Sequence, residues 1–146
     1  MIIFAAVTTS TNMKKIFLLA LVFTQALCSC HENLEERAMR ECQEETRKNC
    51  PRVMSPEMVM DSLAFDKASR TMQCFATVSG SLDTLDLDRK KWLEENLLEG
   101  LINETSNKGY KDAGFNFQYT FYSKKTARVL YSFTYSQKDY YPDMAQ

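Results

Sequence analysis

One histidine and five cysteines are the side chains of this 146-residue sequence best suited to metal binding or nucleophilic chemistry. Two of the cysteines precede the histidine in the run Cys28-Ser29-Cys30-His31, which has the close spacing of metal ligands. A Ser-His-Asp or Cys-His catalytic site needs a histidine inside the folded domain. Because His31 lies in the N-terminal segment, outside the predicted domain, we expect the chain to build neither site.

The carboxylates and glycines supply no second candidate for catalysis. Adjacent glutamates occur at residues 35–36, 44–45 and 94–95. Neighbouring residues point apart on a helix, so these pairs are expected to be solvated surface. Asp83, Asp86 and Asp88 form a cluster, but an EF-hand calcium loop requires glycine at the position that Asp88 occupies. The four glycines of the chain form no phosphate-binding loop, so we predict no enzyme, no cofactor and no metal site.

Residues 13–30 have the order of charged, apolar and small residues that is typical of a secretion signal. Lys14 and Lys15 give a positive start, and residues 16–23 form a short apolar run. Thr24 interrupts this run well before the roughly 20 apolar residues that a membrane-spanning helix needs. We therefore interpret residues 1–29 as a signal peptide that is removed, with Met13 as the true start of translation.

The end of this segment, Leu27-Cys28-Ser29-Cys30, resembles the lipobox of bacterial lipoproteins. The resemblance implies cleavage after Ser29 and acylation of Cys30, with several acyl chains such as palmitate that anchor the protein stably in a membrane. Cleavage there would also divide the apparent metal cluster. His31 stands where an aspartate would retain a lipoprotein in the inner membrane, which favours the outer membrane. The alternative is an ordinary signal peptide that releases a soluble protein.

Three further features are distinctive: the run Asn49-Cys50-Pro51, the strand-like segments within residues 57–79, and the aromatic hairpin at residues 114–136. Together with the lipobox they resemble small uncharacterised lipoproteins of Bacteroidota. This resemblance implies no catalytic residue in the present sequence. The tripeptide Asp83-Thr84-Leu85 resembles the Asp-Ser/Thr-apolar site that Bacteroidota glycosylate on exported proteins, so Thr84 is a candidate for O-glycosylation.

Removal of the signal peptide changes the charge balance and the number of cysteines. Without Lys14 and Lys15, 16 of the 18 basic residues remain against 19 acidic ones, which gives a net charge of −3. A mildly acidic chain with interspersed charges offers no footprint for nucleic acid. Cys42, Cys50 and Cys74 remain in an oxidising compartment, where either one pair forms a disulfide or none of the three pairs.

The spacing of apolar residues predicts an α+β fold. Helical patterns cover residues 31–49 and 83–107, and alternating patterns typical of strands cover residues 57–66, 71–79, 114–122 and 127–136. We expect an N-terminal helical segment followed by β-β-α-β-β, with a four-stranded antiparallel sheet covered on one face by the second helix. Residues 30–50 would then be a lipid-anchored helical spacer, residues 51–137 a single domain, and residues 138–146 a loose tail.

The aromatic residues of the last hairpin and of the tail divide into a core set and a contact set. An alternating row is expected to face the core, at Phe115, Phe117, Tyr119 and Phe121. Tyr122, Tyr140 and Tyr141 lie off this row and form a candidate contact patch. We therefore predict a non-enzymatic binding or structural module, anchored to the cell envelope, with an unknown protein or envelope partner. The alternatives are a periplasmic inhibitor or immunity-like protein that covers a partner enzyme, and a hydrolase that uses unrecognised carboxylates.

Overall fold

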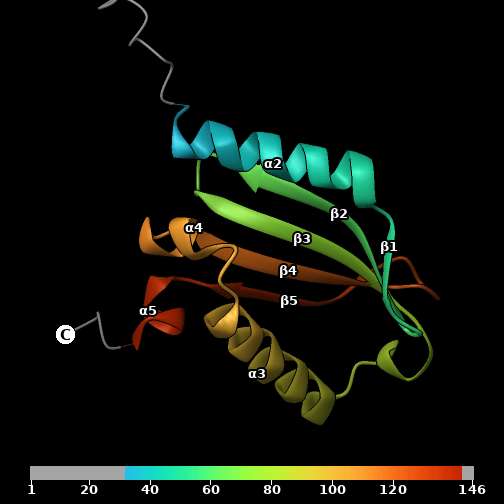
Figure 1. Cartoon of the computed structure of the whole chain (residues 1–146). Coiled ribbons are helices and arrows are strands. Elements are labelled where there is room, and N and C mark those ends of the chain that lie inside the picture. The colour runs from blue at the N-terminus through green and yellow to red at the C-terminus, as the bar shows by residue number, and fades with distance from the viewer. Residues whose placement is uncertain (1–31, 143–146) are drawn as a thin grey trace, which may run out of the picture. The chain divides into compact units, whose positions relative to one another are not determined.

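The computed structural model describes residues 32–142, and residues 33–142 belong to one compact unit (Figure 1). Its elements are α2 (Leu34–Asn49), β1 (Arg52–Ser55), β2 (Met58–Asp66), β3 (Thr71–Val78), the 3-10 helix η1 (Gly80–Leu82), α3 (Leu87–Asn103), α4 (Lys108–Asp112), β4 (Asn116–Ser123), β5 (Val129–Tyr135) and α5 (Gln137–Tyr140). Among these helices none is long and apolar enough to span a membrane. The interpreted signal peptide and Cys30 lie outside the described residues.

The five strands form one sheet in the order β1-β2-β3-β4-β5. The α+β class and the order helix, hairpin, helix, hairpin are confirmed, but the sheet differs from the predicted antiparallel four-stranded one in two respects. β1 adds a fifth strand by pairing with β2, and β3 and β4 run parallel to each other. The parallel pairing arises because the segment containing α3 carries the chain back along the sheet before β4 begins.

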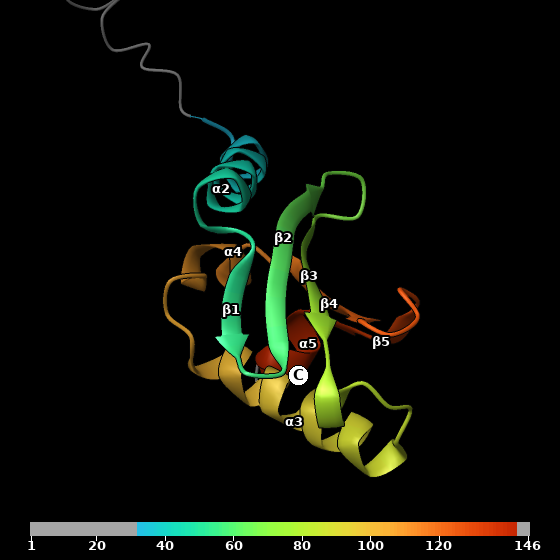
Figure 2. The same cartoon turned by 90° about the vertical axis from the view of Figure 1, so that its right-hand side faces the viewer.

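The helices pack on one face of the sheet, and the other face is open. On the helix face, Met72, Phe117 and Tyr135 stand side by side across β3, β4 and β5. The Tyr135 hydroxyl donates a hydrogen bond to the Glu94 carbonyl of α3 at 2.8 Å. The opposite face presents exposed polar side chains such as Ser132 and Thr134, and none of the helices described here covers it (Figure 2). The prediction that helical structure covers one face only is confirmed, but α2, α4 and α5 share that face with the predicted helix, α3.

α2 packs along β2 and is an integral part of the compact unit, in contrast to the predicted boundary between spacer and domain at residue 50. The side chain of Asn33 caps its first turn, and its small residues Ala38 and Cys42 are buried. The Thr46 hydroxyl accepts a hydrogen bond from the Leu63 amide at 2.7 Å and donates to the Leu63 carbonyl at 2.9 Å. Thr46 of α2 is thereby hydrogen-bonded to the edge of β2 at a residue that β1 does not reach.

The predicted aromatic row forms the centre of the core. Phe115, Phe117 and Phe121 are buried, whereas Tyr119 is half-buried. The ring of Phe115 stacks on Phe65 with 5.4 Å between centroids, which ties the residue just before β4 to β2. This row and its partners on β5 therefore account for most of the large side chains beneath α3, α4 and α5.

α3 is shorter than the predicted helix at residues 83–107. The Asp86 side chain accepts hydrogen bonds from the amides of Asp88 and Arg89, which fixes the start of the helix at Leu87. At the other end, the buried ammonium of Lys111 binds carbonyls of the last turn, and the chain then turns into α4. Capping contacts from outside the helix therefore set both of its ends.

Candidate functional site

Of the two predicted modification sites, Cys30 lies outside the described residues and Thr84 lies within them. Thr84 is exposed on the connection between η1 and α3, where its hydroxyl donates a hydrogen bond to the Ser81 carbonyl at 3.4 Å. The carbonyl of Thr84 accepts a hydrogen bond from the Tyr131 hydroxyl, which holds this loop against β5. An exposed hydroxyl on a fixed loop is compatible with O-glycosylation, which stays a prediction.

The tyrosines predicted to form one contact patch lie apart. Tyr122 is half-buried on the open face of the sheet, with its ring 6.5 Å from that of Phe75. Tyr141 is half-buried at the other end of the domain, where its hydroxyl donates to Asp112 Oδ1 at 2.9 Å. The structure therefore does not bring Tyr122 and Tyr141 together.

Tyr140 belongs to the core, so its assignment to a contact patch was wrong. Its side chain is 1% exposed, and its hydroxyl donates a hydrogen bond to the Phe115 carbonyl at 2.7 Å. The ring also meets that of Phe117 edge to face at 5.7 Å. Because this anchoring residue closes α5, residues 138–142 are an ordered part of the domain and not the start of a loose tail.

The three remaining cysteines are free thiols, so no disulfide joins them in this structure. Burial raises the pKa of the Cys42 and Cys74 thiols to about 11. Thiols of this kind stay protonated near neutral pH and are poor nucleophiles and metal ligands. Within residues 32–142, no three His, Cys, Asp or Glu side chains lie close enough together to hold a metal ion.

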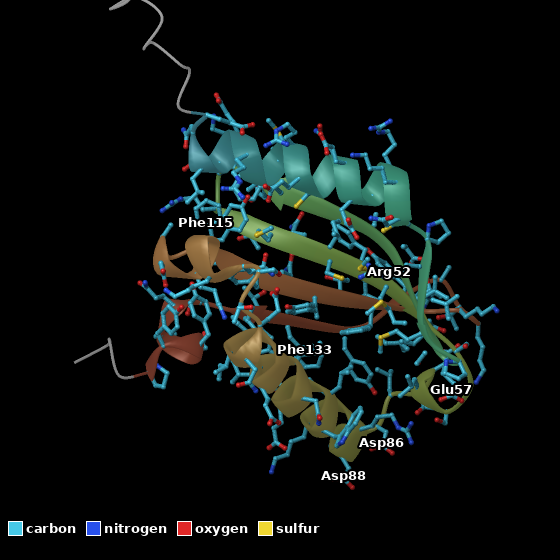
Figure 3. All side chains as sticks on the ribbon, in the orientation of Figure 1. Arg52, Glu57, Asp86, Asp88, Phe115 and Phe133 are labelled. Atoms are coloured by element: carbon cyan, nitrogen blue, oxygen red, sulfur yellow. The ribbon has the colours of Figure 1, made fainter. Side chains whose placement is uncertain are left out.

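A groove of about 700 Å³ lies on the helix face of the sheet. α2 forms one wall, and the connection between α3 and α4 at residues 104–107 forms the other. The floor comes from β2, β3 and β4, and Arg52 of β1 stands at one end (Figure 3). The groove exists because α2 packs on β2 and α3 packs toward β5, so neither helix covers the middle of the sheet.

The floor of the groove is apolar and rich in sulfur. Its lining side chains include Met60, Leu63, Met72, Cys74 and Phe117. Methionine has three rotatable bonds and a polarisable sulfur, so a floor of this composition adapts its shape to an apolar side chain that enters it. The arrangement therefore suits binding by contact with an apolar surface, without acid–base chemistry.

Charged side chains form the rim of the groove, and acidic ones predominate. Glu44 pairs with Lys48 at 3.1 Å, and Glu45 pairs with Arg52 at 3.2 Å. Glu41 accepts a hydrogen bond from the Tyr110 hydroxyl at 2.6 Å. Burial opposes ionisation of Glu41, but hydrogen bonds from Tyr110 and Arg37 outweigh it and lower the pKa of the carboxyl group. The rim thus presents carboxylates that ion pairs and hydrogen bonds hold in place beside the apolar floor.

Sequence reasoning missed the groove, although it identified the residues of its floor as strand residues. The alternation in residues 71–79 places Met72 and Cys74 on one face, and the structure confirms that they share this face. Whether a helix covers them depends on where α2 and α3 dock. The only signal in the sequence was the excess of methionine, including Met54 and Met60, near the future groove.

The described domain is a five-stranded α+β unit with an open groove between its helices. Residues 33–131 match the family model described as "Domain of unknown function (DUF8479)", and because this match spans more than half of the chain, the protein belongs to that family. No curated protein matches the sequence.

Two solved structures share the fold. One is a protein of Pseudomonas aeruginosa thought to be secreted, with a TM-score of 0.60 and 11% identity over 74% of this chain and 97% of that chain. The other is EpsS, the pilotin of the Vibrio vulnificus type 2 secretion system, with a TM-score of 0.60 and 8% identity over 75% of this chain and 93% of that chain. At these identities the likeness concerns the fold alone.

Proposed function

We propose that this protein is a lipid-anchored, non-enzymatic module of the bacterial cell envelope that binds an apolar segment of a partner protein in the groove. The groove is the observation that carries the proposal. Its volume of about 700 Å³ is sufficient for several side chains of a bound helix or strand. Its methionine-rich floor resembles in composition the surfaces with which other proteins accept amphipathic helices.

The rim of the groove adds specificity for a segment with charged flanks. Glu41, Glu44, Glu45 and Glu104 outnumber Lys48 and Arg52 along the groove. An apolar segment flanked by lysine or arginine would find carboxylates beside the floor, and complementary charges of this kind set partner choice and association rate. The proposed partner segment is therefore apolar at its centre and basic at its ends.

Two observations support a place in the cell envelope. The compact unit and the family match both begin at residue 33, three positions after Cys30, the predicted acylation site. The fold is also shared with a pilotin from a type 2 secretion system, which supports a protein partner in an envelope system. Acylation of Cys30 and placement in the outer membrane are parts of the proposal.

Site-specific crosslinking in cells tests the groove. A photo-crosslinking amino acid at position 54, on the exposed rim, is expected to capture a partner protein, whereas the same amino acid at position 134, on the open face, is not. Adding Met72→Glu should reduce the adduct at position 54 at least tenfold, because an unpaired carboxylate would be buried against the apolar segment.

The matched control is Thr134→Glu, which adds the same charge on the other face and should leave the adduct unchanged. Thermal unfolding of both variants separates loss of binding from loss of fold. Capture from position 134 alone would contradict the groove proposal and favour an inhibitor that covers its partner with the open sheet face.

Mass spectrometry of the mature N-terminus tests the anchor. We expect the first residue to be Cys30 with attached acyl chains, and the protein to sediment with outer membranes. Cys30→Ser should move the protein out of the membrane fraction, because the acyl chains supply most of the membrane affinity. A mature chain that begins elsewhere, or that stays soluble with Cys30 intact, would rule the anchor out.

A further inference from the structure

The end of the domain opposite the first turn of α2 brings together the start of α3, the loop before it, and the turn between β4 and β5 (Figure 1 and Figure 2). Hydrogen bonds fix this arrangement. The Lys125 amide donates to Asp83 Oδ2 at 3.0 Å, and the Asp86 amide donates to the Tyr131 hydroxyl at 2.9 Å. We call this end the tip and define it by residues 83–92 and 124–129.

The tip exposes large apolar side chains. Their exposed fractions are 84% for Leu87, 78% for Leu85, 56% for Trp92 and 52% for Val129. Trp92 also borders a shallow hollow formed with Leu82 and the start of α3. Single exposed apolar residues are common on protein surfaces, but several at one end of a small domain indicate a surface that contacts something.

Basic side chains surround these apolar residues. The exposed basic residues of the tip are Lys90, Lys91, Lys124, Lys125 and Arg128. Of these five cations, only Lys91 forms an ion pair within the described residues, with Glu95 at 3.9 Å. The concentration of positive charge is notable because the chain without its signal peptide carries a net charge of −3.

The carboxylates of the tip do not neutralise this charge. Asp83 is buried, where hydrogen bonds from Ser123 and the Lys125 amide lower the pKa of its carboxyl group. Asp86 caps α3 by accepting from two backbone amides. Asp86 and Asp88 lie at the start of α3 (Figure 3), so two exposed carboxylates face five exposed cations.

We infer that the tip binds an anionic lipid surface. Leucine and tryptophan beside clustered lysines are the composition with which proteins enter the interface of an anionic membrane. A protein partner is less well matched, because protein interfaces are depleted in lysine and enriched in arginine, whereas four of the five cations of the tip are lysines. This surface is separate from the groove, so the inference does not depend on the proposed partner segment.

Trp92 is the only tryptophan of the chain, so its fluorescence reports on the tip directly. The test uses the chain from residue 30 onward with Cys30→Ser, which removes the predicted signal peptide and the predicted acylation site and leaves the tip unchanged. Vesicles that contain phosphatidylglycerol should shift the Trp92 emission to shorter wavelength, and lipids brominated in their acyl chains should quench it. Vesicles of phosphatidylcholine alone should do neither.

Charge variants complete the test. Lys124→Gln with Lys125→Gln should raise the lipid concentration for half-maximal shift about 30-fold, since each lysine near an anionic surface contributes about 1 kcal/mol. The matched control is Lys67→Gln with Lys138→Gln, which removes the same charge from the opposite end and should have little effect.

Three results would overturn the inference. The first is that anionic vesicles leave the Trp92 emission unchanged, and the second is that phosphatidylcholine vesicles shift it as much as anionic ones do. The third is that the two double variants lose binding equally. Crosslinking from position 87 to an acidic protein, combined with no response to vesicles, would assign the tip to a protein partner instead.

Discussion

Replacing Lys111 by methionine is expected to lower the free energy of unfolding by about 3 kcal/mol, measured by urea denaturation followed by circular dichroism. Methionine keeps the length and the apolar stem of lysine but removes the ammonium group. Because small domains are stable by only about 5–15 kcal/mol, a loss of this size should move the midpoint of unfolding well to lower urea concentration.

The expected loss follows from the contacts of the Lys111 ammonium, which is 2% exposed. Nζ donates hydrogen bonds to the carbonyls of Leu101 at 2.7 Å, Ile102 at 3.1 Å and Glu104 at 2.6 Å. These carbonyls lie in and just after the last turn of α3, where no helical amide remains to bind them. A cation at this position also interacts favourably with the negative end of the helix dipole.

Lys108→Met is the matched control. Lys108 precedes Lys111 by three residues on α4, and its ammonium pairs with the exposed carboxylate of Asp112 at 2.5 Å. Exposed pairs of this kind contribute little, so the variant should unfold at nearly the wild-type urea concentration. Equal effects of the two substitutions would show that Lys111 stabilises α3 by general charge and not by capping it.

Local patterns were sufficient to predict most of the elements. The alternation of aromatic and polar residues predicted a strand at residues 114–122, and β4 runs from Asn116 to Ser123. Leu93 and Leu101 lie on the buried side of α3, as their spacing predicts. These patterns succeed because the side chains that face the core recur along the chain with the period of the strand or helix itself.

Patterns failed where a contact distant in sequence decides the outcome. β1 is short and mostly exposed, so it has no apolar alternation to reveal it. The stripe on α2 is narrow, and Ala38 and Cys42 are small, which predicts a weakly packed helix. In the structure their small size lets the helix approach β2 closely, and Thr46 bonds to the Leu63 backbone, 17 residues away.

The groove and the tip illustrate the same limit for binding surfaces. The sequence indicates which side chains share a strand face, such as Met72 and Cys74, but not which part of the face stays uncovered. The cations of the tip belong to two segments, one at the start of α3 and one after β4, more than 30 residues apart. Only the crossover that makes β3 and β4 parallel brings these segments to one end.

Tyr140→Ala tests the C-terminal segment, for which the sequence-based prediction of a loose tail differs from the structure. We expect it to lower the free energy of unfolding by about 4 kcal/mol, the loss typical of a large buried aromatic side chain. If residues 138–146 were a loose tail, the substitution would have no effect. Urea denaturation therefore distinguishes directly between the sequence-based prediction and the structure.

A second variant separates the two contributions of Tyr140. Tyr140→Phe keeps the ring that meets Phe117 and removes the hydroxyl that binds the carbonyls of Phe115 and Lys111. It should cost about 1 kcal/mol, the usual net contribution of one hydrogen bond. Lys138→Ala, on the exposed side of the same short helix, should leave the unfolding midpoint nearly unchanged. If Tyr140→Ala behaved like Lys138→Ala, α5 would not be anchored in the core, and the hydrogen bond from the Tyr140 hydroxyl to the Phe115 carbonyl would have no energetic role.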